Sequence, residues 1–166
     1  MAYIDTLLED EQHPIDLIES IAENQDWEFD RVGEDQIAMA VEGAWRTYSI
    51  TVAWCEFDQT LRLIATYDLD APKDRNGAVY ELLNLVNDQC WAGAFTYWES
   101  QGLMTYRYGL VLPDGQFPTP CQIDTMITVA VRAAERYYPA VQMAIWSDST
   151  PEESLQVAIA ESYGRA

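Results

Sequence analysis

The chain has 166 residues and a mass of 18.9 kDa, a length that suits one compact domain. Hydrophobic residues make up 49% of the sequence and charged residues 22%, which excludes a disordered chain, a collagen and a coiled-coil rod. Because 28 acidic residues stand against 9 basic ones, the formal net charge is -19. A surface of that charge repels phosphate backbones and anionic lipids, so we expect neither a nucleic acid nor a membrane as a partner.

The cysteines and the start of the chain indicate the compartment. The first ten residues lack the basic segment, the apolar core and the cleavage motif of an export signal, so we expect a cytoplasmic protein. Cys55, Cys90 and Cys121 are far apart and odd in number, and are expected to be reduced thiols. Since the one histidine, His13, has no cysteine near it, no metal site is expected. No other cofactor is expected either.

The first third of the chain predicts an arm, a helix and a series of strands. Residues 1–12 are predicted to form an acidic N-terminal arm, and residues 13–166 a single domain. A short amphipathic helix begins at Pro14, because proline suits the first helical position. Its apolar stripe consists of Ile15, Ile18, Ile21 and Ala22.

From Trp27 the apolar residues alternate with a period of two, which is typical of strands. Strands are predicted at residues 27–32, 36–41, 45–57 and 61–69, with short turns between them. Short turns between alternating segments predict an antiparallel meander with one buried face.

After the meander the apolar residues first follow a helical period and then alternate with a period of two again. The segment that ends at Trp91 places Val79, Leu82, Leu83, Val86 and Cys90 on one helical stripe. Ala94–Glu99 and Leu103–Leu112 then predict a hairpin with a two-residue turn at Gln101-Gly102.

Two further helices are predicted at the end of the chain. Thr119 and Pro120 supply the cap and the first residue of a long helix, which Pro139 is expected to kink or end. Another helix begins at Thr150-Pro151, with acids in its first turn. The order α-β-β-β-β-α-β-β-α-α predicts an α+β fold, with helices packed on one face of an antiparallel sheet.

No arrangement of residues in the sequence supports catalysis. The glycines are scattered, so no phosphate-binding loop is indicated, and a nucleophilic triad would have to use His13 at a helix start. Of the 28 acids, 12 lie in residues 1–35, where they are expected to be solvated. We therefore expect a protein that is not an enzyme.

The hairpin supplies the candidate binding surface. A two-residue turn pairs Trp98 with Thr105 and Thr96 with Arg107. These four side chains then share a face that no helix needs to cover. Because Trp and Arg dominate the energetics of interfaces, this face is a candidate for partner binding or dimer formation. The alternative is that Arg107 simply lies over Trp98 on an open sheet.

Several segments, in this order and spacing, resemble the YbjN family of bacterial proteins over most of residues 80–155. They are Leu82-Leu-Asn-Leu-Val-Asn-Asp-Gln-Cys-Trp-Ala-Gly-Ala-Phe, Gly102-Leu-Met-Thr-Tyr-Arg-Tyr-Gly-Leu-Val-Leu, Tyr138-Pro-Ala-Val-Gln, Trp146 and Thr150-Pro-Glu-Glu-Ser-Leu. Relatives tend to carry a histidine beside Gly93, arginine-histidine at Arg107-Tyr108 and Gly-Gly at Ser147-Asp148. These departures argue against a histidine-based site in this chain.

The resemblance implies a cytoplasmic, non-enzymatic regulator of sensory transduction, tied to stress, motility and surface behaviour. It also implies that residues 13–166 form one YbjN-like domain, with a fold similar to type III secretion chaperones. Those are small, acidic and often dimeric proteins that bind polypeptides. On the helix that the family shares, Asn84, Asn87 and Trp91 are candidates for ligand contact. The alternative for the asparagines is capping and hydrogen bonding to a neighbouring loop.

Three functions are therefore compared. The first is an adaptor or chaperone-like regulator that binds a protein partner through the open sheet face, as a homodimer. The second is a small-molecule sensor with a pocket between the sheet and the helix end at Asn84 and Trp91. The third is a hydrolase that uses acids and a metal, for which the sequence offers no motif.

Overall fold

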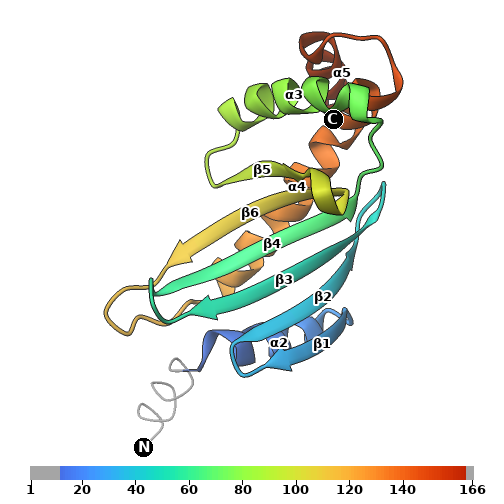
Figure 1. Ribbon diagram of the computed structural model, residues 1–166. Helices are drawn as coiled ribbons and strands as arrows, with labels where there is room; N and C mark the ends of the chain where they lie inside the picture. The colour runs from blue at the N-terminus through green and yellow to red at the C-terminus, as the bar shows by residue number, and fades with distance from the viewer. Residues whose placement is uncertain (1–11, 164–166) are drawn as a thin grey trace, which may run out of the picture.

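The computed structural model describes residues 12–163, so the acidic arm predicted at residues 1–12 lies, apart from Gln12, outside the described residues. The elements follow the predicted order, with two added 3-10 turns (Figure 1). They are α2 (Pro14–Asn24), β1 (Glu28–Gly33), β2 (Gln36–Glu42), β3 (Thr47–Cys55), β4 (Thr60–Asp68), η1 (Lys73–Arg75), α3 (Asn76–Asp88), β5 (Gly93–Trp98), η2 (Glu99–Gln101), β6 (Leu103–Val111), α4 (Pro120–Trp146) and α5 (Pro151–Tyr163).

All six strands form one antiparallel sheet in the order β1-β2-β3-β4-β6-β5. The first four strands are the predicted meander. The chain then leaves the sheet as α3, returns at the outer edge as β5, and fills the place beside β4 with β6. The predicted α+β class with an antiparallel sheet is confirmed.

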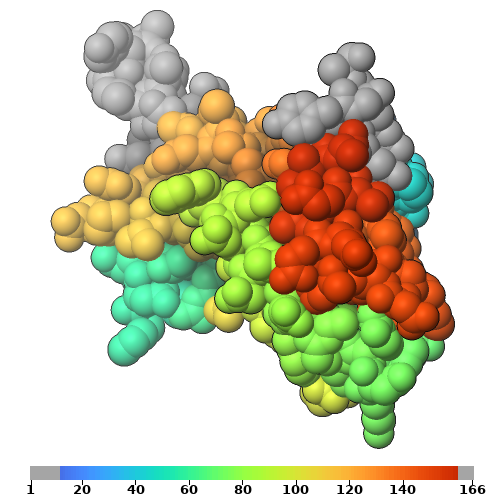
Figure 2. All heavy atoms as spheres, turned by 90° about the horizontal axis from the view of Figure 1, so that it is seen from above, coloured from blue at the N-terminus to red at the C-terminus, as the bar shows by residue number. Residues whose placement is uncertain are grey.

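Helices cover one face of this sheet, as Figure 1 shows. Ile15 and Ile18 of α2 are fully buried against the first strands, and the 27-residue α4 crosses behind β4 and β6. Alternate strand residues such as Ile50 and Leu61 meet these helices and are fully buried. Seen from above, α3 and α5 lie side by side and pack on α4 (Figure 2). The predicted single buried face is confirmed.

The two proline-led helices begin where the sequence predicts. His13 caps α2 by accepting a hydrogen bond from the backbone N–H of Ile15 at 3.2 Å. Thr119 and Gln122 form a capping box at the start of α4. Pro139 does not end α4, which continues to Trp146, so termination is excluded. Burial of the residues that follow Pro139 offsets its lost backbone hydrogen bond.

The predicted register of the β5–β6 hairpin is wrong by two residues. Trp98 faces Leu103, Thr96 faces Thr105, and Ala94 faces Arg107. The cause is the connection: the 3-10 turn η2 is followed by Gly102 at φ 61°, so four residues link the strands instead of two. Because side chains alternate with a period of two, a shift of two residues leaves every side chain on its predicted face.

One carboxylate, Glu135 of α4, fixes the turn between β2 and β3. Its oxygens accept hydrogen bonds from the backbone N–H of Ala44 at 2.9 Å, from that of Trp45 at 3.2 Å and from the Tyr48 hydroxyl. A Cβ at Gly43 would lie 2.3 Å from Glu135 Oε1, so a larger residue there would displace the carboxylate from the turn. Burial, together with the hydrogen bond to Glu135, raises the pKa of Tyr48 well above its usual range.

We expect Glu135→Ala to lower the free energy of unfolding by about 1–3 kcal/mol, because it leaves several donors of the turn without an acceptor. The measurement is urea denaturation at neutral pH. Glu81→Ala is the matched control, since Glu81 is an exposed acid on α3, and it should change stability by less than about 0.5 kcal/mol. Equal effects of the two substitutions would show that the Glu135 contacts do not stabilise the fold.

Candidate functional site

The face of the sheet opposite the helices is uncovered by any element of residues 12–163 (Figure 1). The strand register places many small or polar side chains on this face. Among them are Ala38, Ala40, Ser49, Thr51, Ala53 and Thr66 on middle strands and Thr96 on the edge strand β5. Such side chains give another molecule close access to the sheet without exposing a large apolar surface.

A hollow of about 690 Å³ lies on this face over β4, β6 and β5, and we call it the open-face groove. Arg62 and Ile64 of β4, Thr96 and Trp98 of β5, and Arg107 of β6 line it. The hollow exists because two positions carry almost no side chain: Gly109 lies opposite Arg62, and Ala94 lies opposite Arg107.

The structure brings three of the four predicted hairpin residues together in the groove. Trp98 is half-buried, whereas Thr96 and Arg107 are exposed. Thr105 is different, because its side chain is fully buried and its hydroxyl has no hydrogen-bond partner within the described chain. The expectation that Thr105 is accessible is wrong: Thr66 and Thr96 flank it on the neighbouring strands and shield it from solvent.

Charge is distributed unevenly over the uncovered face. In the groove, Arg62 pairs with Asp58, and this hydrogen bond lowers the pKa of the Asp58 carboxyl. The Arg107 side chain has no ion pair or hydrogen bond to any described residue. At the far edge of the same face, Glu28 and Asp30 of β1 are exposed acids. The groove is therefore the basic side of a face whose other side is acidic.

The sequence contained a signal for the β4 contribution that our prediction did not use. Leu61, Leu63 and Ala65 alternate as buried residues, which places Arg62 and Ile64 on the uncovered face. The alternation along a strand does not show which other strand lies beside it in the sheet. Only the sheet order, with β6 beside β4, brings Arg62 and Ile64 next to Arg107.

Asn87 protects the edge of the sheet rather than lining a pocket. Its side-chain amide donates to the backbone carbonyl of Phe95 at 3.0 Å and accepts from the backbone N–H of Phe95 at 2.7 Å. Because β5 is an edge strand, these are groups that a further strand would otherwise pair with. Asn84 lies on the same helix and is exposed, and its side chain has no hydrogen bond to a described residue.

Trp91 lines a smaller hollow of about 270 Å³ between the α3–β5 connection and α4. Its side chain is 97% exposed. Arg132 and Arg136 of α4 and the half-buried Cys90 also line this hollow, but neither Asn84 nor Asn87 does. Of the three residues proposed for a pocket at this helix end, only Trp91 is therefore in place.

Within residues 12–163 no group of three or more His, Cys, Asp or Glu side chains is placed to hold a metal ion. The same residues include no helix with the length and apolar character needed to cross a membrane.

The sequence matches the family model YbjN, "Putative bacterial sensory transduction regulator", over residues 14–143. The chain belongs to the YbjN family. Among solved structures it is similar to YbjN from E. coli, described as "a putative transcription regulator", with a TM-score of 0.51 and 10% identity. The match covers 91% of this chain and 92% of the other. No protein with a curated function matches the sequence significantly.

The family membership and the α+β fold expected from the sequence are both confirmed by these comparisons. At 10% identity, the likeness to E. coli YbjN shows the fold alone. The likeness to type III secretion chaperones stays a prediction.

We expect Asn87→Asp to lower the free energy of unfolding by about 1–3 kcal/mol, because a carboxylate cannot donate to the Phe95 carbonyl. Asn84→Asp is the matched control, since it adds the same charge to the same helix without breaking a described hydrogen bond. Urea denaturation of both variants measures the difference. Equal loss of stability in the two would mean that charge, not the contact with Phe95, explains the effect.

Proposed function

We propose that this YbjN-family protein is a non-enzymatic cytoplasmic adaptor in sensory or stress signalling, which binds a segment of a partner protein in the open-face groove. The observation that carries the proposal is that Arg107, whose side chain has no described partner, lines the same groove as Trp98 on an uncovered sheet face. A chaperone-like action on the bound segment is part of the same proposal.

The chemistry of the groove indicates what the segment carries. The Arg107 guanidinium favours a carboxylate, and Ile64 opposite it favours an apolar side chain next to that carboxylate. The Trp98 ring, further along the groove, favours another apolar side chain. Because the net charge of -19 repels an acidic protein at long range, the partner as a whole is neutral or basic. The carboxylate of such a partner comes from an acidic side chain or from the C-terminus. The surface around it is uncharged or basic.

The segment binds across the face rather than at the edge of the sheet. On β5, the Asn87 side chain already occupies both backbone groups of Phe95. Beneath the groove, the backbones of β4, β6 and β5 are already paired with one another. The bound segment therefore contacts side chains and not the backbone of these strands. This mode differs from the addition of a strand to a sheet edge.

A second copy of the chain is the other occupant that fits this face. In a two-fold arrangement, Glu28 and Asp30 of one copy can face Arg107 of the other, since an isologous interface pairs different parts of the same surface. The homodimer expected from the sequence therefore belongs to the same proposal. The measured mass of the purified protein in solution, by light scattering, tests it.

The test is a tagged pull-down from native cytosol, followed by binding of a synthetic peptide from the captured partner. The double variant Trp98→Ala/Arg107→Glu should lose the partner and weaken peptide affinity at least tenfold, about 1.4 kcal/mol. The matched control is Trp91→Ala/Arg132→Glu, which makes the same changes at the other hollow and should bind normally. If the groove variant retains capture and peptide affinity, the groove is not the binding site.

A second candidate function is a small-molecule sensor at the Trp91 hollow. It rests on Arg132 and Arg136, neither of which has an acidic partner in the described chain, beside an aromatic ring that is 97% exposed. This set favours a planar anion, which would stack on the Trp91 ring while the arginines neutralise its charge.

A panel of aromatic carboxylates and nucleotides tests this candidate by thermal shift. A ligand at 100 times its Kd should stabilise the protein by about 2.7 kcal/mol. The shift should disappear in Trp91→Ala and persist in Trp98→Ala. A panel without any shift argues against the sensor.

A further inference from the structure

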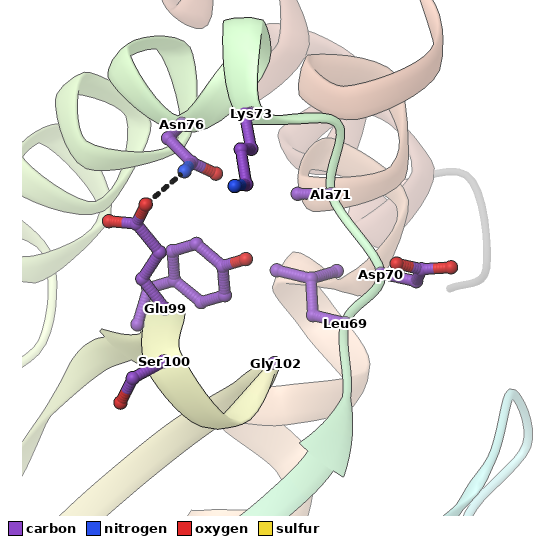
Figure 3. Close-up of a pocket in the computed structure, with 9 residues that line it drawn as sticks. Leu69, Asp70, Ala71, Lys73, Asn76, Glu99, Ser100 and Gly102 are labelled. Atoms are coloured by element: carbon purple, nitrogen blue, oxygen red, sulfur yellow. Dashed lines mark hydrogen bonds between the residues drawn. The ribbon is translucent and has the colours of Figure 1, made fainter.

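A third hollow, of about 690 Å³, lies where β4 ends and α3 begins (Figure 3). We call it the strand-end pocket. It shares no lining residue with the open-face groove or the Trp91 hollow. Figure 3 shows Lys73 and Asn76 entering it from the helical side and Glu99 from the turn after β5. The residues that carry the argument are Leu69, Asp70, Ala71, Lys73, Asn76 and Glu99.

Asn76 brings a buried acceptor without a donor to this pocket. Its side chain is only 8% exposed, and its Nδ2 donates to Glu99 Oε1 at 2.7 Å. This bond fixes the orientation of the amide, so the other atom is the carbonyl oxygen Oδ1. That oxygen is shielded from solvent and accepts no hydrogen bond within residues 12–163. A buried acceptor of this kind is costly unless a donor reaches it.

Glu99 is held in place at the same end of the pocket. Besides Asn76, the Tyr80 hydroxyl donates to it, and this contact raises the pKa of Tyr80. The carboxylate is therefore positioned before any ligand arrives. Together with the Asn76 oxygen, it makes this side of the pocket a place for a positively charged donor, whereas the side chain of Asp70, across the pocket, points away from it (Figure 3).

Lys73 supplies the opposite charge. Its ammonium group has no ion pair or hydrogen bond to a described residue, although Glu99 and Asp70 line the same pocket. Of the Lys and Arg side chains in residues 12–163, only those of Arg31 and Arg62 pair with carboxylates, so Lys73 is one of several cations left available in this acidic chain. Lys73 can therefore bind a carboxylate in the same pocket in which Asn76 Oδ1 and Glu99 can accept hydrogen bonds.

We infer that the strand-end pocket binds a small zwitterion of the α-amino acid type. The ammonium group of the ligand donates to Asn76 Oδ1 and to Glu99, and its carboxylate lies against Lys73. The side chain of the ligand packs on Leu69 and Ala71, the apolar part of the lining. The inference is independent of the adaptor function, because it uses none of the groove residues.

Simpler ligands fit the lining less well. A divalent cation lacks ligands, since no group of three or more suitable side chains is present in the described chain. A phosphate or another simple anion would meet Glu99. A simple amine would meet Lys73. Only a molecule with both charges satisfies the two sides of the pocket at once.

The first experiment is thermal unfolding of the full chain with each of the twenty L-amino acids. At least one amino acid should raise the melting temperature. Calorimetry then compares that amino acid with its decarboxylated amine and its deaminated acid, and each analogue should bind at least tenfold more weakly. Absence of a shift with all twenty, or an amine that binds as well as the amino acid, would overturn the inference.

The variants locate the site without disturbing the fold. Lys73→Gln changes an exposed side chain and should weaken binding of the amino acid at least tenfold. The matched control, Arg107→Gln, removes a cation from the open-face groove and should leave this affinity unchanged. Equal affinity of Lys73→Gln and the wild type would place the amino acid elsewhere. Failure of this inference would appear as unchanged amino-acid affinity in Lys73→Gln. Failure of the adaptor proposal would appear as unchanged partner capture in the Trp98/Arg107 variant, so the two failures are distinguishable.

Discussion

The fold depends on one constraint: helices cover the six-stranded sheet on one side only, so one of its two faces is buried. The 27-residue α4 is the main cover, and Glu135 ties it to the turn between β2 and β3. Apolar side chains that alternate along the strands meet α2 and α4 and supply the core. The other face needs side chains that tolerate water, and small and polar residues occupy it.

This one-sided packing also decides where the surface is hollow. Over β4, β6 and β5 no helix fills the space above Ala94 and Gly109, which leaves the open-face groove. At the strand ends, α3 begins at an angle to the sheet and leaves the strand-end pocket beneath Asn76. Along the edge, the contact of Asn87 with Phe95 keeps β5 from pairing with another chain. The features that concern binding are thus consequences of how the core is covered.

Six of the nine basic residues fall into two groups in this acidic protein. Arg31 is held by two carboxylates, and Arg75 by backbone carbonyls near the end of α4. These side chains stabilise the fold. Lys73, Arg107, Arg132 and Arg136 have no acidic partner among the described residues, and each of them lines a hollow. With a net charge of -19, such local cations are places where a carboxylate can bind despite the field of the whole protein.

The sequence by itself determined the order of the elements, the helix starts at Pro14 and Thr119 and the shared face of Trp98 and Arg107. These depend on periodicity and capping over a few neighbouring residues, and a register error of two leaves strand faces unchanged. Only the tertiary structure decided that Arg62 lies beside Arg107, that Thr105 is shielded and that the Asn76 oxygen has no donor among residues 12–163. Each of these depends on which strands and helices become neighbours. Contacts between residues far apart in the chain set that arrangement, and local sequence patterns do not encode it.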